Sequence, residues 1–416
     1  MKVVIIGAGI GGLALAIACR QENLDVVVLE RAPALEPLGV LPALKGKGVI
    51  VDSIEYVRYS NGKPLFGMDQ KDIESFGDNW LVIARPDYHQ VLWDAAKDAG
   101  AELRLGSEME TIDFQASCVY LVGGEKVAGD VIVGADGLWS RARNQVLNKD
   151  SPATETGDLA YRCTIPAEDL QALNDEALNK LMQKKTATCW MGPDRHCVLY
   201  PLKGGKAFNL VLLGPDNLPK DVRRAPGNLD EMRRSFEGWD PRLTKMLSGV
   251  TSVLRWKLCH HEELESWTRE SVVLLGDACH PTLPYQAQGA AMAVEDGAVL
   301  GKLLGLLDKS QSRMTEFRNR VPEILKVYES LRKPRTSANV QGAASNRQTY
   351  HFPDGPDQEA RDAWISSSKS SPSTYTYAFA DPEYLRTMLA FDCIADSIRA
   401  FNTWESKQRD LLLGKL

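Results

Sequence analysis

Short runs of consecutive apolar residues alternate with helical patterns at the start of the chain. Residues 2–6 (KVVII) and 25–30 (DVVVLE) are two such runs, and LALAIACRQ between them has helical spacing. Apolar runs bounded by turn residues are typical of parallel strands that are buried on both faces. They predict a βαβ unit. The runs 130–137 (DVIVGADG) and 271–278 (SVVLLGDA) predict two more buried strands.

The pattern differs between about residues 157 and 260, where short strands (CVLYPL, FNLVLL and SVLRWKL) alternate with one charged helix near 228–238. This texture predicts an antiparallel sheet. An earlier segment, 54–65, predicts a hairpin that turns at Asn61-Gly62. Helices are predicted over residues 85–100, 288–306 and 312–346 and in roughly the last thirty residues, with a polar linker at 366–377.

Composition narrows the class of protein. The 416 residues are 44% hydrophobic and 25% charged, as in ordinary globular proteins. A net charge of −6 argues against a nucleic-acid partner. Because no apolar run is long enough to span a membrane, we expect a soluble, cytoplasmic protein. We also expect a monomer or a homodimer.

Metal binding is not expected. The eight cysteines include no CxxC pair, which argues against zinc and thioredoxin-like sites. His260-His261 and Glu262-Glu263 are adjacent, so on a strand these side chains point to opposite faces. The basic stretch around Arg332–Arg335 is interpreted as a solvated helical face.

The segment between the first strand and the first helix reads Gly7-x-Gly9-x-x-Gly12. In a dinucleotide fingerprint the first glycine allows the tight turn, the second admits the pyrophosphate, and the third lets the helix pack on the strand. Glu30 ends the next strand, where an acid hydrogen-bonds an adenosine ribose, and Arg31 follows in the same candidate cofactor site. The motif leaves NAD and FAD open, and the alternative is a glycine turn with a chance acid.

Two further strands end in an aspartate beside a glycine, at Asp136-Gly137 and Gly276-Asp277. The carboxylate can accept hydrogen bonds from ribityl or ribose hydroxyls, and the glycine permits close backbone approach. Either pair alone is usually a strand-to-turn cap. Both pairs behind an N-terminal fingerprint favour FAD.

These motifs resemble those of the group A FAD-dependent aromatic monooxygenases, the aromatic hydroxylases. The most specific stretch is GDACHPTLPYQAQGAAMAVEDGAVLGKLL, whose detailed residue pattern resembles that of the salicylate-hydroxylase-like branch. So do GDLAYR, CVLYPLKGGKAFNLVLL, LRWKL and HFPDGPDQEARD. The resemblance covers nearly the whole chain, and the single GxGxxG agrees with a family that has no separate NAD(P)H domain.

The resemblance implies an α/β fold: a GxGxxG FAD-binding Rossmann-like domain, an antiparallel-sheet substrate domain and a helical C-terminal region. The expected FAD-binding parts are 1–156, with a hairpin insertion at about 50–85, and 266–330. The substrate domain is expected at 157–265 and the helical region at 331–416. In the implied reaction NADH or NADPH reduces FAD, O2 adds to form a C4a-hydroperoxyflavin, and a phenolic or aromatic-acid small molecule is hydroxylated.

Several residues of the candidate cofactor site follow the last glycine-aspartate pair. Pro284 stiffens a loop, and Gly289 and Ala290 open a helix whose free N–H groups can stabilise the anionic flavin edge. By resemblance, Arg85 approaches the flavin or its pyrophosphate; the alternative is a solvated arginine at a helix end. His280 is interpreted as a structural hydrogen-bonding residue.

Arg162 and Tyr200 are the candidate catalytic residues, both on the predicted substrate sheet. The arginine can pair with a carboxylate or phenolate, and the tyrosine hydroxyl can orient a phenol. Ordinary sheet roles are the alternatives for both. Trp190 and Trp256 either line the pocket or belong to the core.

Two alternatives to a hydroxylase stay open. The same motifs serve a flavin-dependent epoxidase or an oxidative tailoring enzyme of a secondary metabolite. Against the family pattern, the chain lacks a helix's worth of residues near 39–49, beside the flavin. The alternative from another class is therefore a non-catalytic relative with impaired FAD binding.

Overall fold

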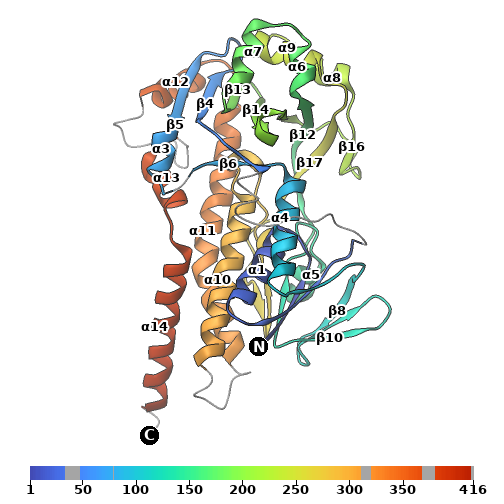
Figure 1. The fold of residues 1–416 in the computed structure, drawn as a ribbon, viewed down its shortest axis with the longest axis vertical. Helices are drawn as coiled ribbons and strands as arrows, with labels where there is room; N and C mark the ends of the chain where they lie inside the picture. Colours follow the sequence, from blue (N-terminus) through green and yellow to red (C-terminus); the bar gives the residue numbers. More distant parts are fainter. Residues whose placement is uncertain (33–46, 78, 311–319, 368–379, 414–416) are drawn as a thin grey trace.

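The computed structural model describes residues 1–32, 47–77, 79–310, 320–367 and 380–413 (Figure 1). Its first sheet has six strands in the order β18-β19-β11-β1-β2-β7. These are β1 (Lys2–Ile6), β2 (Asp25–Leu29), β7 (Glu102–Arg104), β11 (Val131–Gly134), β18 (Thr268–Arg269) and β19 (Val272–Leu274). The neighbours pair in parallel except β18, which is antiparallel to β19. The parallel strands predicted from the apolar runs are confirmed.

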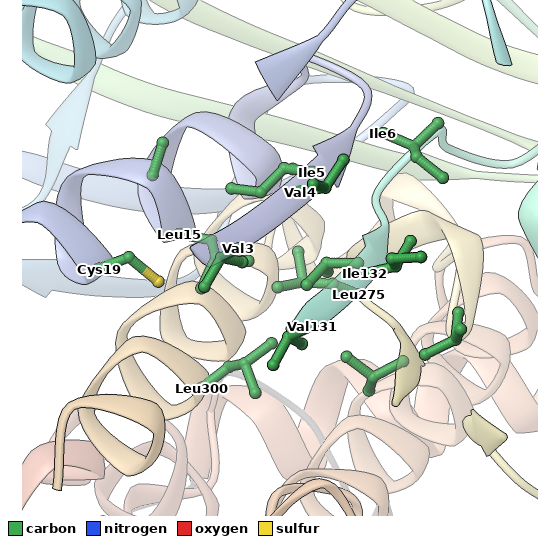
Figure 2. Packing of buried hydrophobic residues seen from close by; sticks show 14 of the residues in the cluster. Val3, Val4, Ile5, Ile6, Leu15, Cys19, Val131, Ile132, Leu275 and Leu300 are labelled. Carbon is green, nitrogen blue, oxygen red and sulfur yellow. The ribbon is translucent and has the colours of Figure 1, made fainter. Parts of the chain in front are cut away.

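Glycines let two helices pack very closely beside this sheet. α1 (Ile10–Gln21) lies against α10 (Gly289–Ser310), and Figure 2 shows apolar side chains of β1, β11, α1 and α10 meeting in the core. A Cβ atom on Gly297 would lie 2.6 Å from the Leu15 nitrogen, and one on Gly301 would lie 2.6 Å from the Ala18 Cβ. A larger residue at either position would push the helices apart.

The second sheet has eight strands in the order β16-β17-β12-β15-β14-β13-β4-β5 and lies above the first in Figure 1. These are β4 (Ser53–Arg58), β5 (Pro64–Asp69), β12 (Thr154–Pro166), β13 (Thr186–Gly192), β14 (Arg195–Leu202), β15 (Ala207–Pro215), β16 (Arg224–Pro226) and β17 (Leu254–His260). Neighbours are antiparallel except β4 and β13, which are parallel. The predicted hairpin at 54–65 is therefore part of this sheet.

The two faces of the eight-stranded sheet contact different parts of the molecule. Tyr161 and Cys163 on β12 belong to a core that includes residues of α6 (Ala167–Gln171), α7 (Glu176–Gln183), α8 (Leu229–Arg234) and α9 (Pro241–Ser248). Ala160 belongs to a separate core with Tyr285 and Ala343. Because side chains alternate along a strand, Arg162 lies on the same face as Ala160.

One predicted helix differs from the structure. The charged helix expected near 228–238 is shorter than predicted: α8 ends at Arg234, and the next helix, α9, begins only at Pro241, beyond the predicted range. Gly238 adopts a φ of +77° between them, which breaks the helical path. Asp240 then starts the second helix by accepting a hydrogen bond from the Arg242 backbone N–H.

Smaller elements complete the described structure. β8 (Met109–Asp113), β9 (Cys118–Leu121) and β10 (Lys126–Ala128) form a three-stranded sheet, and β3 (Val49–Ile50) pairs with β6 (Leu81–Val82). The other short helices are α3 (Gln70–Glu74), α4 (Arg85–Asp98), α5 (Arg141–Leu147) and the 3-10 helices η1 (Lys203–Gly205), η2 (Gly276–Ala278) and η3 (Pro284–Gln286).

The C-terminal part is helical, as expected, and the predicted fold class is confirmed. Its helices are α11 (Val321–Tyr350), α12 (Pro356–Ser367), α13 (Pro382–Leu389) and α14 (Cys393–Leu413). α14 packs along α10 and α11 (Figure 1). The predicted polar linker at 366–377 lies outside the described residues, apart from the last two residues of α12. None of the described helices combines the length and the apolar character needed to cross a membrane.

A buried histidine pair joins the end of α11 to the eight-stranded sheet. His196 Nδ1 on β14 lies 2.8 Å from His351 Nε2, and the Tyr285 ring packs against His196. The Tyr285 hydroxyl donates to Asp158 at 2.6 Å, and Arg347 of α11 forms an ion pair with the same carboxylate. Burial lowers the pKa of His196 well below its ordinary value and the pKa of His351 to about 4.

This pair should make the molecule sensitive to mild acid. The unfolded chain takes up a proton on His351 below about pH 6.5, whereas the folded chain does so only near pH 4, so stability falls as the pH falls through this window. We expect His351 to account for a loss of about 2 kcal/mol between pH 7.5 and pH 5, measured by urea unfolding. His351→Gln should flatten this dependence and His260→Gln should not. An unchanged slope in His351→Gln would contradict the assignment.

Candidate functional site

The glycine turn after β1 is shaped for close packing at two positions and left open at the third. Gly7 has a φ of +103°, and a Cβ atom there would lie 2.6 Å from the Ala135 carbonyl oxygen. A Cβ on Gly12 would lie 2.1 Å from the Gly7 oxygen. A Cβ on Gly9 would meet nothing nearer than 4.0 Å. Packing within the protein therefore requires Gly7 and Gly12, whereas Gly9 keeps space free at the start of α1.

Glu30 lies directly beside this turn. Its carboxylate accepts hydrogen bonds from the backbone N–H groups of Ala8 and Ala32, both at 2.8 Å. His89 Nε2 on α4 lies 2.5 Å from the Ala8 carbonyl oxygen and supports the turn from the other side. Arg31 is exposed at the end of the described N-terminal segment. Glu30 is thus held beside the glycine turn, and its predicted contact with an adenosine ribose stays a prediction.

Asp136 has a local partner set. Its carboxylate accepts hydrogen bonds from the Ser140 hydroxyl at 2.5 Å and from the backbone N–H groups of Arg141 and Ala142 at 2.8 and 3.1 Å. These bonds fix the start of α5, which is the strand-to-turn alternative weighed for this motif. Gly137 follows with a φ of +79° and open space around its Cα. Cofactor contact at Asp136 and Gly137 stays a prediction.

The turn after β19 carries Asp277, the acid of the second predicted glycine-aspartate pair. Gly276 has a φ of +63°, and Asp277 follows it. Burial raises the pKa of Asp277, while the charges of His280 and Arg85 oppose the increase. Within the described residues no hydrogen bond satisfies this carboxylate, so it is free to accept one from a ligand hydroxyl.

The first turn of α10 adds backbone N–H groups beside this carboxylate. Pro284 lies in η3, and Gly289 and Ala290 begin α10. Ala290 and Ala291 are exposed, although most of the helix beyond them is buried. Small exposed residues at a helix start leave its N–H groups accessible to an anionic or polar group.

A buried ion-pair network holds the turn and the helix together. Asp296 on α10 is fully buried and accepts hydrogen bonds from the Gly276 N–H at 3.1 Å, from His280 Nε2 at 2.5 Å and from Arg332 Nε at 2.7 Å. Burial by itself would raise the pKa of Asp296, but His280 and Arg332 lower it overall. His280 thus has the structural role expected from the sequence.

The interpretation of Arg332 as part of a solvated face is wrong. Its side chain is 1% exposed and also pairs with Glu295 at 2.7 Å. A guanidinium can be buried on a helix when carboxylates on a facing helix satisfy it, and those carboxylates lie 36 and 37 residues away in sequence. No periodicity in the basic stretch revealed this pairing.

The second wall of the site is the face of the eight-stranded sheet that carries Arg162 and Tyr200. Burial and the nearby charge of Arg85 lower the pKa of Arg162, while Tyr200 opposes the decrease. Burial raises the pKa of Tyr200, and Arg162 and the Asn209 amide oppose the increase. The Arg162 Nε and Asn209 Nδ2 atoms are buried without a regular hydrogen-bond partner. The structure therefore brings both candidate catalytic residues together and leaves polar atoms for a ligand.

The two tryptophans separate by sheet face. Trp190 is fully buried on the face opposite Arg162, and its Nε1 donates to Asp240 at 2.8 Å. It is a core residue and the pocket alternative for it is wrong. Trp256 is 39% exposed, and the Arg162 guanidinium carbon lies 5.8 Å from its ring centre.

These features fit FAD. Gly9 leaves room for a pyrophosphate, Glu30 stands where a ribose is expected, Asp277 can accept from a ribityl hydroxyl, and the start of α10 can face the flavin ring. The residues that would hold FAD come from the carboxyl ends of β1, β2 and β19, where ligands bind in open α/β sheets.

Comparison with known proteins agrees with this geometry. The model of an FAD-binding domain family matches residues 1–343. The FAD-dependent monooxygenase OpS4 of Beauveria bassiana (strain ARSEF 2860) is 37% identical over 419 residues, which cover 95% of this chain and 96% of OpS4. This chain belongs to the family of FAD-dependent aromatic monooxygenases. The 3-hydroxybenzoate 6-hydroxylase of Klebsiella oxytoca is 32% identical over 373 residues, 84% of this chain and 89% of that enzyme.

Solved structures share the fold at lower identity. The crystal structure of CtdE in complex with FAD and substrate 4 matches with a TM-score of 0.78 and 20% identity, covering 97% of this chain and 98% of CtdE. The salicylate hydroxylase substrate complex matches with a TM-score of 0.76 and 22% identity, covering 96% and 98%. The predictions of FAD, of NAD(P)H as co-substrate and of an oxidoreductase that hydroxylates aromatic small molecules are confirmed at the level of the family.

The alternative of a relative with impaired FAD binding rests on the segment near 39–49. Residues 39–46 lie outside the described residues, so that alternative stays a prediction.

The glycine turn offers a test that separates folding from cofactor binding. Gly9→Ala places a methyl group in the open space, so FAD affinity should fall at least tenfold while unfolding stability changes by less than about 1 kcal/mol. Gly7→Ala strains the backbone and should destabilise the fold by about 1–3 kcal/mol. The flavin absorbance retained after desalting and urea unfolding give the two readouts. A wild-type protein that stays colourless with added FAD would favour the non-catalytic alternative.

The ion-pair network offers a second test. Asp296→Asn leaves the Arg332 charge buried without its full compensation and should lower stability by about 3 kcal/mol, and FAD retention should fall because the Gly276 turn loosens. Glu176→Gln, which breaks an exposed pair with Lys180, is the control and should change neither property. Thermal unfolding with and without FAD measures both effects. Equal behaviour of the two variants would refute the structural role.

Proposed function

We propose that this enzyme hydroxylates an aromatic acid, held through its carboxylate. The observation that carries the proposal is the pair of neighbouring guanidinium groups of Arg85 and Arg162. The charge of Arg85 lowers the pKa of Arg162, and within the described residues neither guanidinium forms an ion pair with a carboxylate. Two such cations at the edge of a buried wall favour an anionic ligand.

Arg162 is suited to bind the substrate carboxylate. Its planar fork can donate two parallel hydrogen bonds to a carboxylate, and its Nε is already buried without a partner. Forming that interaction would relieve the cost of an unsatisfied buried donor. Arg85 is exposed at the start of α4, and its charge acts on both Asp277 and Arg162, so it adds positive potential to the same site.

Tyr200 is suited to orient the ring. Burial keeps its hydroxyl protonated at neutral pH, so the group can donate a hydrogen bond to a phenolic oxygen. Val198 and Val211, on the same sheet face, are partly buried and supply apolar contact for the ring. Bound FAD, once reduced by NAD(P)H, supplies the oxygen chemistry. The protein positions the ring and excludes water.

The names of relatives support this substrate class. They include 3-hydroxybenzoate 6-hydroxylase and the 3-amino-4-hydroxybenzoate 2-monooxygenase of Streptomyces cremeus, which is 30% identical over 385 residues. Epoxidation or another oxidative tailoring step stays an alternative, because relatives such as OpS4 are named only as FAD-dependent monooxygenases. A cytoplasmic location and a monomeric or homodimeric state are further predictions of the sequence.

The test is the response of Arg162 variants to substrate charge. Arg162→Ala should raise the KM for a hydroxybenzoate about 30- to 1,000-fold in an NAD(P)H oxidation assay, because a buried charge-assisted contact contributes about 2–4 kcal/mol. Flavin content should not change. Arg162→Lys should recover part of the loss.

The matched control is Arg255→Ala. Arg255 lies on the neighbouring strand β17 and pairs with Tyr161, so its side chain is on the sheet face opposite Arg162. This variant should leave the KM unchanged. If neutral amides of the same acids are hydroxylated as well as the acids, and Arg162→Ala has no effect on either, the aromatic-acid proposal fails.

A further inference from the structure

Two large aromatic side chains are exposed where the two sheets meet. Trp139 is 44% exposed in the segment that leads from Asp136 into α5, and Trp256 is 39% exposed on β17. Each ring presents a large apolar face to solvent, and covering such a face with a planar ligand group is favourable.

Arginines cover both rings. The Arg223 guanidinium carbon lies 3.5 Å from the Trp139 ring centre, and that of Arg224 lies 4.7 Å from the Trp256 ring centre. Arg162 approaches Trp256 from the substrate wall at 5.8 Å. We call Trp139, Arg223, Arg224 and Trp256 the Trp–Arg surface. It begins at Arg162 and reaches the segment after β11.

The charge of this surface is not neutralised by nearby acids. Lys257 forms ion pairs with Glu155 and Asp216 at 3.1 and 3.2 Å, and Glu231 forms one with Arg255 at 3.9 Å. Within the described residues Arg223 and Arg224 are exposed and form no ion pair. Exposed planar cations next to aromatic faces suit a ligand that combines planar rings with phosphate groups.

We propose that the Trp–Arg surface binds the pyridine nucleotide co-substrate, with a base stacked on tryptophan and the diphosphate held by Arg223 and Arg224. The reaction class needs NAD(P)H, yet the chain has one GxGxxG motif and the fold uses that turn for FAD. The reductant therefore needs another surface. This one has matching chemistry and connects directly to Arg162 at the candidate site. The inference rests on the family's use of NAD(P)H and not on the aromatic-acid proposal.

The experiment measures nucleotide binding to the FAD-loaded enzyme by calorimetry, with NADP+, NAD+ and ADP-ribose as probes. Arg223→Ala and Trp139→Ala should each weaken binding about tenfold or more, since one charge-assisted or stacking contact contributes about 1.4 kcal/mol or more. Arg223→Lys keeps the charge but loses the planar fork, so it should show a smaller loss. The quenching of tryptophan fluorescence by bound nucleotide should also fall in Trp139→Ala.

The matched control is Arg269→Ala. Arg269 is an exposed arginine on β18 of the six-stranded sheet, and its guanidinium carbon lies 4.1 Å from the Phe114 ring centre. This variant should leave nucleotide affinity unchanged, and the flavin spectrum should be normal in every variant. Unchanged nucleotide affinity in a Trp139→Ala/Arg223→Ala double variant overturns the proposal. So does a loss that appears only in the KM for the aromatic substrate, because the surface would then be a substrate entrance. Weakened nucleotide binding supports it even if no aromatic acid is hydroxylated.

Discussion

The site depends on one buried carboxylate. Asp296 is fully buried, and its two oxygens hold the turn after β19, the ring of His280 and the guanidinium of Arg332. In a low-dielectric interior such a group is stable only while every partner is present. Because the turn it holds continues into Asp277, the same carboxylate positions the acid that is predicted to bind the cofactor.

The helix that carries Asp296 is fixed from its other side by glycine. Gly297 and Gly301 bring α10 against the backbone of α1, which itself begins at the open Gly9. The starts of both helices are thereby held next to the carboxyl ends of the parallel strands. Helix starts supply N–H groups and a partial positive charge, so the fold prepares a binding place for a dinucleotide before any side chain touches it.

The eight-stranded sheet supplies the other half of the chemistry. Arg162 lies on the face that meets the cofactor wall, and its neighbours include Arg85, Tyr200 and Trp256. The arginine therefore stands between the proposed substrate place and the Trp–Arg surface. In this position the Arg162 guanidinium would attract both the substrate carboxylate and the approaching nucleotide.

The sequence by itself determined the local elements and the family. Apolar runs predicted the parallel strands, because strands buried on both faces need them, and the spacing of Gly7, Gly9 and Gly12 identified the turn. Only the tertiary structure decided how distant parts meet. The hairpin at 54–65 was visible, but its pairing with β13 was not, since strand partners are chosen by non-local contacts. The burial of Arg332 was not predicted, and the sequence left Trp190 open between core and pocket. The burial of a side chain depends on partners far along the chain, which no local pattern encodes.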